Sequence, residues 1–228
     1  ALELADAFIV NVTDAELTVQ IKLVAADALD GQQKYDDSRK RYLLVVEQHS
    51  KHALAADALY FAAFAALKLK QHDNVIIDAQ TFLGKYPKHD FQPDVAKLLE
   101  ESRILKSADL FQDKKHAEVV KILAASIKDN PQGSRVVDGL LLLARSSAAL
   151  QEIDAAKGYA ARLIKDFPES KLVAEAQFRL GEYHYGEKEY ELAIKQYATV
   201  VKDHSDSVFV ANSLYSQAWS EVLTGKPD

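Results

Sequence analysis

The 228-residue sequence predicts an all-α protein built as a solenoid of helical hairpins. Glycine and proline are scarce, at 8 and 5 residues, whereas the strong helix formers alanine, leucine, lysine and glutamate are plentiful. The sequence also repeats at intervals of 37, 37, 44, 37 and 37 residues, and the equivalent positions are Thr13, Ser50, Pro87, Pro131, Pro168 and Ser205. A sustained period of this length is typical of stacked repeats.

The repeat divides the chain into a half-unit, five complete units and a terminal helix. The half-unit covers residues 1–13. It has the apolar spacing of a second helix, with apolar residues at Ala1, Ala5, Phe8 and Ile9. The complete units are 14–50, 51–87, 88–131, 132–168 and 169–205. Residues 206–223 are expected to form a last first helix, followed by the helix-stopping Gly225 and Pro227. Because the chain starts in mid-repeat and contains no methionine, we expect a fragment of a longer array.

Each complete unit is predicted to be one helical hairpin. In the unit 169–205, the first helical pattern covers residues 172–185 and the second covers residues 190–201, with the polar turn 186–189 between them. The second pattern has apolar residues at the three- and four-residue spacing of one helix face. Proline or serine at the end of each unit stops the second helix, because proline cannot continue it and serine can cap the next one.

One first-helix position is small in each unit, and twelve residues later the second helix carries a small or β-branched residue. Helices approach to about 8 to 10 Å only where the contact side chains are small. We therefore expect the two helices of each hairpin to approach most closely at these positions, which include Ala26, Ala63, Ala144, Gly181, Ala193 and Ala218.

The longer unit, 88–131, leaves two registers open. Strict counting puts Ser107 at the small position, but it also places Arg103 and Lys106 at packing positions. We prefer a shift of one residue, which puts Ala108 at the small position and apolar residues beside it.

Leu180-Gly181, Tyr190, Ala193 and Tyr197, with the helix stop at Ser205, resemble the tetratricopeptide repeat, whose common length is 34 residues. The 37-residue period and the segments 167–170 and 180–185 are similar to bacterial envelope members, the Tol-Pal coordinating proteins and the outer-membrane assembly lipoproteins. The resemblance implies a right-handed superhelix whose first helices line the concave face. It also implies the bacterial periplasm or cell envelope, while leaving the cytoplasm open.

Carrying the groove-facing positions of such repeats over to this chain gives a concave face rich in aromatic and acidic residues. The partner-binding candidates are Tyr60, Phe64, Arg145, Glu175, Phe178, Glu182, Tyr185, Tyr215 and Trp219. Further carboxylates border them, at Asp27, Asp30, Asp57 and Asp138. Such a face suits an apolar segment with basic flanks, extended or helical. The alternative is that several of the rings pack against neighbouring repeats.

Composition and motifs argue against other classes of protein. Without cysteine there is no disulfide framework or thiolate metal site, and a net charge of 28 − 34 = −6 without a basic stripe argues against a nucleic-acid partner. The longest apolar stretch, 58–67, is half the length of a membrane span. The seven histidines form no zinc motif, and no nucleophile elbow or phosphate-binding glycine loop is present. We therefore expect no metal, no cofactor and no enzymatic activity.

The sequence thus predicts a non-catalytic scaffold that binds another protein or a peptide segment on a concave aromatic and acidic face, in a bacterial cell-envelope assembly. The alternative is an architectural or self-associating repeat module that acts through its unfinished ends or its convex surface.

Overall fold

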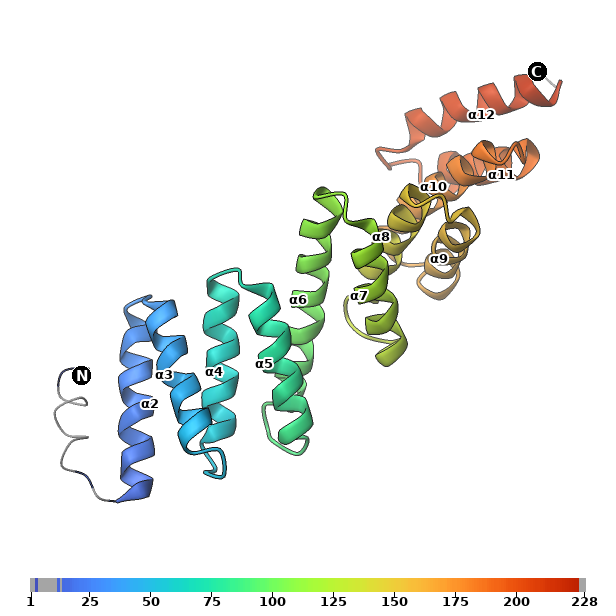
Figure 1. Ribbon diagram of the computed structural model, residues 1–228. Coiled ribbons are helices and arrows are strands. Elements are labelled where there is room, and N and C mark those ends of the chain that lie inside the picture. The colour runs from blue at the N-terminus through green and yellow to red at the C-terminus, as the bar shows by residue number, and fades with distance from the viewer. Residues whose placement is uncertain (1–2, 4–11, 13, 226–228) are drawn as a thin grey trace. The chain divides into compact units, whose positions relative to one another are not determined.

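The computed structural model describes residues 3, 12 and 14–225, and all the regular elements among residues 14–225 are helices (Figure 1). The predicted all-α solenoid of hairpins is confirmed. The chain divides into two compact units, Ala1–Lys106 (unit 1) and Ser107–Asp228 (unit 2). The N-terminal helix was predicted from four residues that lie outside the described residues: Ala1, Ala5, Phe8 and Ile9.

The helices follow one another as antiparallel neighbours within each unit (Figure 1). Unit 1 contains α2 (Ala15–Gly31), α3 (Tyr35–Gln48), α4 (Ala55–Lys68), α5 (His72–Lys85) and most of α6 (Gln92–Gln112). Unit 2 contains the end of α6, then α7 (His116–Asp129), α8 (Val136–Ala149), α9 (Ile153–Asp166), α10 (Val173–Gly186), α11 (Tyr190–Asp203) and α12 (Val210–Thr224). Among the described residues, no helix has both the length and the apolar character that a membrane span requires.

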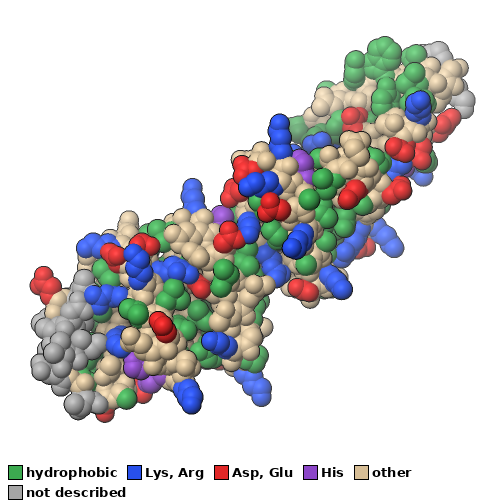
Figure 2. Space-filling model, viewed as in Figure 1, with side chains coloured by type: hydrophobic (Ala, Val, Ile, Leu, Met, Phe, Trp, Pro, Cys, Tyr) green, Lys and Arg blue, Asp and Glu red, His purple; other side chains and the backbone are tan. Residues whose placement is uncertain are grey.

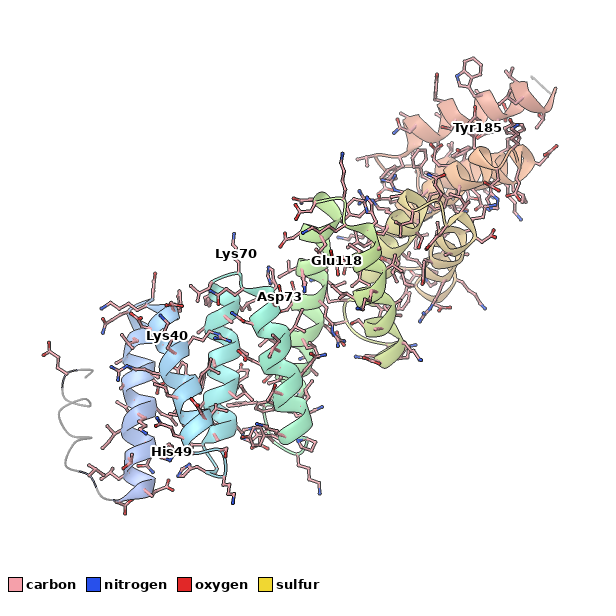
Figure 3. The ribbon with its side chains drawn as sticks, in the orientation of Figure 1. Lys40, His49, Lys70, Asp73, Glu118 and Tyr185 are labelled. Atoms are coloured by element: carbon pink, nitrogen blue, oxygen red, sulfur yellow. The ribbon has the colours of Figure 1, made fainter. Side chains whose placement is uncertain are left out.

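The turn inside each hairpin has the same backbone form. One residue per turn is left-handed, with φ between 56° and 63°, and these residues are Gln33, Lys70, Lys114, Gln151 and Lys188. The N–H of the next residue donates to the carbonyl five residues before it, as from Lys34 to Leu29 and from Glu189 to His184, both at 2.9 Å. This is a Schellman closure, in which glycine usually takes the left-handed position. Here lysine and glutamine take it, and Lys70 points away from its turn (Figure 3).

The turns between hairpins are closed by side chains at another repeated position. Ser170 and Ser207 each accept, through Oγ, the backbone N–H two residues later, at 3.2 Å. At the equivalent positions, His52 and His89 accept through Nδ1, at 3.1 and 3.2 Å. Two of the seven histidines therefore have a structural role in turns.

The core is built by placing each second helix between two first helices. In unit 1, one cluster joins α2, α3 and α4, and its buried members are Val19, Ala26, Tyr42, Val45, Ala58 and Ala62. In unit 2, a cluster centred on α11 contains Phe178, Ala193, Tyr197 and Val200, with Phe209 and Val210 packed against it. A hairpin therefore completes its core with the first helix of the next hairpin, as expected of a solenoid.

The first helices α4, α8 and α10 are buried more deeply than the second helices. Helix α4 buries eight residues, of which seven are alanine, whereas α3 buries only Ser38, Tyr42 and Val45. Alanine leaves room for close neighbours on several sides of a helix. In each unit, we call the solvent-exposed surface of the first helices the first-helix face. It is formed by α2 and α4 in unit 1 and by α8, α10 and α12 in unit 2.

The preferred register of the longer unit is wrong. Ser107 is fully buried, whereas Ala108 is partly exposed, so strict counting holds. The charged neighbour Lys106 is accommodated because its ammonium group bonds to the Asp73 carboxylate. The long lysine stem can pack against apolar surface while its charged end reaches this partner.

Candidate functional site

The first-helix face of unit 2 carries a carboxylate that is held in place from two directions. Glu182, exposed on α10, accepts a hydrogen bond from the Tyr197 hydroxyl of α11, and Ser216 Oγ of α12 donates to Glu182 Oε1 at 3.1 Å. The Tyr197 side chain is fully buried. Burial, and next the bond to Glu182, raise the pKa of Tyr197, so the hydroxyl remains a donor at physiological pH. The negative charge of Glu182 is therefore fixed at the surface.

Unit 1 repeats this geometry with the same spacing. The buried Tyr42 donates to Asp27 Oδ1 at 2.7 Å, and tyrosine and acid are fifteen residues apart in both pairs. Burial, followed by the bond to Asp27, raises the pKa of Tyr42. This pairing was not among the sequence-based expectations, although the sequence contains a signal for it. The two units whose first helix has a carboxylate at this position have tyrosine on the second helix.

Two exposed rings lie on α12, which contacts α10 directly. Tyr215 is 67% exposed and Trp219 is 49% exposed, and the two rings meet edge to face with centroids 6.3 Å apart. Figure 2 shows hydrophobic side chains gathered over this C-terminal end of unit 2. Tyr185, labelled in Figure 3, is partly buried and meets Tyr190 edge to face at 5.6 Å. Tyr215 and Trp219 thus provide most of the open aromatic surface near Glu182.

The structure corrects the expectation for Phe178, which is only 9% exposed. Its ring stacks on Phe209 at 5.3 Å and lies 5.9 Å from the Tyr197 ring. The chain between α11 and α12 brings Phe209 over this position, with the Phe209 N–H bonded to Ser207. Phe178 therefore belongs to the core beneath the face.

Five of the six predicted close-approach residues are buried: Ala26, Ala63, Ala144, Gly181 and Ala193. A Cβ added to Gly181 would meet Tyr197 Cε1 at 2.5 Å, so the close neighbour is sixteen residues later in the chain. Ala218, the equivalent of Gly181 on α12, is exposed instead. The reason is that no described helix covers α12 as α11 covers Gly181.

The remaining charged candidates of unit 2 have partners within the unit. The Arg145 guanidinium lies 4.6 Å from the centroid of the Phe111 ring, a cation–π contact. Glu175 accepts from the Arg179 guanidinium at 2.8 Å, one helical turn away. These contacts orient Arg145 and Glu175 and partly neutralise the charge of Glu175, so Glu182 is the more available of the two carboxylates.

The first-helix face of unit 1 carries an aromatic cluster. The tilted rings of Tyr60 and Phe91 have centroids 4.5 Å apart, and Phe61 lies 5.7 Å from Tyr42 and 6.2 Å from Phe91. Phe64 is more than one third exposed, and Lys68 Nζ lies 4.9 Å from its ring centroid. Phe61 was not predicted from the sequence, because the groove-facing position was assigned to Tyr60. Adjacent helical residues point in different directions, so Phe61 was not expected on the same face.

Asp57 adds a carboxylate beside this cluster. Its pKa is raised by burial, and the His89 imidazole, 3.6 Å away, acts in the opposite direction. The same imidazole closes the turn after α5 through Nδ1. The pair therefore links a loop to α4.

No group of three or more potential metal ligands converges within the described residues.

A stack of hairpins in which second helices pack between first helices defines an α-solenoid. A family model described as tetratricopeptide repeat matches residues 23–89 and 141–207, more than half of the chain. The chain therefore belongs to the tetratricopeptide repeat family. This fold is a scaffold for protein–protein interaction and is generally non-catalytic, and nothing in the described residues points to an enzyme.

Solved structures agree with this fold. The chain is similar to BtubC (BKLC) from P. vanneervenii, with a TM-score of 0.56 and 13% identity, covering 91% of this chain and 85% of that one. It is also similar to the apo form of RapI, with a TM-score of 0.52 and 11% identity, covering 92% of this chain and 58% of that one. At these identities the similarity shows the fold alone. A comparison with curated proteins found no match.

Proposed function

We propose that this chain is a non-catalytic scaffold that binds a peptide segment or a partner protein on its first-helix faces. The observation that carries the proposal is the arrangement on α10 and α12, where a carboxylate fixed by Tyr197 and Ser216 lies near two exposed rings. A surface whose polar groups are already ordered loses little conformational entropy on binding. Exposed aromatic rings add large contact area with few rotatable bonds.

The chemistry of these faces favours a partner that is apolar with basic residues. Glu182 in unit 2 and Asp27 in unit 1 present carboxylates held by buried tyrosines, which are suited to lysine or arginine. The rings of Tyr215 and Trp219 can contact either an apolar side chain or a cation. Because opposite charges also increase association rates, binding should weaken as ionic strength rises.

We place this scaffold in a bacterial cell envelope. The support is the resemblance of the 37-residue repeat, with its segments 167–170 and 180–185, to envelope proteins of the Tol-Pal coordinating and outer-membrane assembly types. Fractionation of native cells tests this location. Recovery of the protein in the periplasmic or envelope fraction is expected, and recovery with cytosolic markers alone would contradict it.

A second candidate function is self-association or an architectural role, favoured by the exposed apolar surface of α12. Besides Tyr215 and Trp219, its large exposed apolar residues are Leu214, Val222 and Leu223, each close to half exposed. Exposed Ala218 occupies the position at which Gly181 packs under α11. A helix from another copy of the chain could pack on this surface.

Photo-crosslinking in the native cell separates the two functions. A crosslinking side chain is placed at Tyr185 or at Tyr215, with a matched probe at the exposed Lys195 on second helix α11. Crosslinks to another protein from the first two sites, and not from Lys195, are expected. Crosslinks between copies of the chain would support the second function. Equal crosslinking from Lys195 would contradict a site confined to the first-helix face.

A further inference from the structure

A cavity of about 260 Å³ opens in unit 2, away from the residues proposed for partner binding. Its lining combines side chains of α7, α8 and α9 with Pro131, which lies between α7 and α8. The helical residues are Ala124, Ile127, Lys128, Leu143, Tyr159 and Arg162. Leu143 is fully buried and Ile127 nearly so, which gives the cavity an apolar floor. A cavity of about 150 Å³ can hold benzene, so this one has room for a single aromatic or branched side chain.

Within the described residues, neither cation of this cavity makes an ion pair with a carboxylate of another helix. Lys128 makes no ion pair within the described part of the chain. Arg162 uses only Nε, at 3.3 Å from Asp166 Oδ2 on its own helix, which leaves its terminal nitrogens available. Elsewhere, Arg39 pairs with Asp78 of the next second helix, and Lys157 pairs with Glu189. The cavity therefore differs from these places, because its two cations have no ion-pair partner on a neighbouring segment within the described part of the chain.

The next repeat shows that these polar residues are not required to build a hairpin. Thirty-seven residues later, Gln196 replaces Tyr159 and Thr199 replaces Arg162. Gln196 accepts a hydrogen bond from Gln177 of α10, whereas the residue equivalent to Gln177 is the apolar Leu140. The hairpin of α8 and α9 thus lacks this internal bond, and α9 carries an aromatic ring and a guanidinium at these positions instead.

We propose that this cavity binds a carboxylate carried on an apolar body about the size of one side chain. The apolar part would lie on Leu143 and Ile127, and the carboxylate would accept hydrogen bonds from Arg162 and Lys128. Charge-assisted bonds of guanidinium to carboxylate are among the stronger ones in proteins. Such a group is found in a free aromatic or branched acid and in the C-terminal residue of a peptide. The site lies outside the first-helix face, so it does not depend on the proposed scaffold function.

The test is a titration of the protein with 3-phenylpropionate, followed by amide chemical shifts. Saturable shifts are expected around Ala124, Leu143 and Tyr159. The neutral 3-phenylpropan-1-ol should bind at least tenfold more weakly. Arg162→Thr introduces the residue that the next repeat carries, so it should keep the fold while weakening 3-phenylpropionate binding at least tenfold. Lys128→Gln should also weaken it, whereas Lys202→Gln, at the equivalent position two repeats later, should leave it unchanged.

Four outcomes would overturn the proposal. They are the absence of saturable shifts at these residues, equal binding of the alcohol, unchanged binding to Arg162→Thr, or an equal loss in Lys202→Gln. A peptide that ends in phenylalanine, compared with its C-terminal amide, then identifies the source of the carboxylate. Competition by the free-carboxylate peptide alone would identify a chain terminus as ligand. Binding of 3-phenylpropionate without any peptide binding would identify a small acid.

Discussion

Arg39→Met should destabilise unit 1 by leaving a buried carboxylate without its partner. Arg39 of α3 and Asp78 of α5 meet at 2.7 Å, and their side chains are only 15% and 8% exposed. Burial raises the pKa of Asp78, and Arg39 acts in the opposite direction. Removing one partner of a buried pair costs about 3 to 5 kcal/mol. Because both side chains keep a little solvent contact, we expect about 3 kcal/mol at pH 7.

Urea unfolding followed by circular dichroism measures this loss. With a slope of about 2 kcal/mol per molar urea, the midpoint should fall by about 1.5 M. Arg39→Met combined with Asp78→Leu should restore most of the stability, since an apolar pair can replace a buried ion pair. Lys40→Met is the matched control on the same helix, because its pair with Asp36 is exposed to solvent and should leave the urea midpoint nearly unchanged.

The pH dependence gives an independent check on the same pair. In Arg39→Met the pKa of native Asp78 is raised further above its unfolded value, because the opposing cation is gone. A carboxyl group with a raised native pKa binds a proton more readily in the folded state than in the unfolded state. The loss of unfolding free energy in Arg39→Met is therefore largest above the native pKa of Asp78, and it shrinks as the pH falls through that pKa. The difference from the unmodified chain should therefore be smaller at pH 5 than at pH 7. A loss under about 1 kcal/mol at pH 7, or a larger loss at pH 5, would refute the reasoning.

Three further predictions concern the hairpin of α10 and α11, each measured by urea or thermal unfolding. Lys188→Gly should stabilise the protein by about 1 kcal/mol, because φ at this residue is 62° and glycine adopts it without strain; a lower melting temperature would contradict this. Gly181→Leu should lower the free energy of unfolding by about 1 to 3 kcal/mol, because the added side chain overpacks against Tyr197. Ala218→Leu, at the exposed equivalent position, should change it by less than about 0.5 kcal/mol. Equal effects of the two variants would rule out the close contact between position 181 and Tyr197. Tyr197→Phe should cost about 1 kcal/mol by removing the bond to Glu182, and an unchanged midpoint would show that the bond contributes nothing.

The sequence could predict the fold because hairpin boundaries depend on local chemistry. The helices predicted over 172–185 and 190–201 are observed as Val173–Gly186 and Tyr190–Asp203. Apolar spacing within one helix and stops between helices are both visible in the sequence. The period then places the hairpins in order, since each can complete its core only with the next.

The candidate site was harder to predict because it depends on contacts between distant segments. Periodicity puts Phe178 on the side of α10 that faces the groove, but it does not reveal that Phe209 will cover it. In the longer unit, charge alone argued against Lys106 at a packing position. The bond of Lys106 to Asp73, 33 residues away, removes that objection. Both differences arise from tertiary contacts that residue type and spacing do not encode.

The binding face and the hairpin core of unit 2 are connected through one tyrosine. Gly181 leaves the space that the Tyr197 ring fills, and the hydroxyl of that ring orients Glu182, which Ser216 also contacts from α12. A side chain at position 181 would therefore displace a surface carboxylate without touching it. It follows that partner binding can be lost in two ways, by removing the charge or by misplacing it. Glu182→Gln removes the charge and keeps an acceptor for Tyr197, so it is the variant that isolates electrostatics from packing.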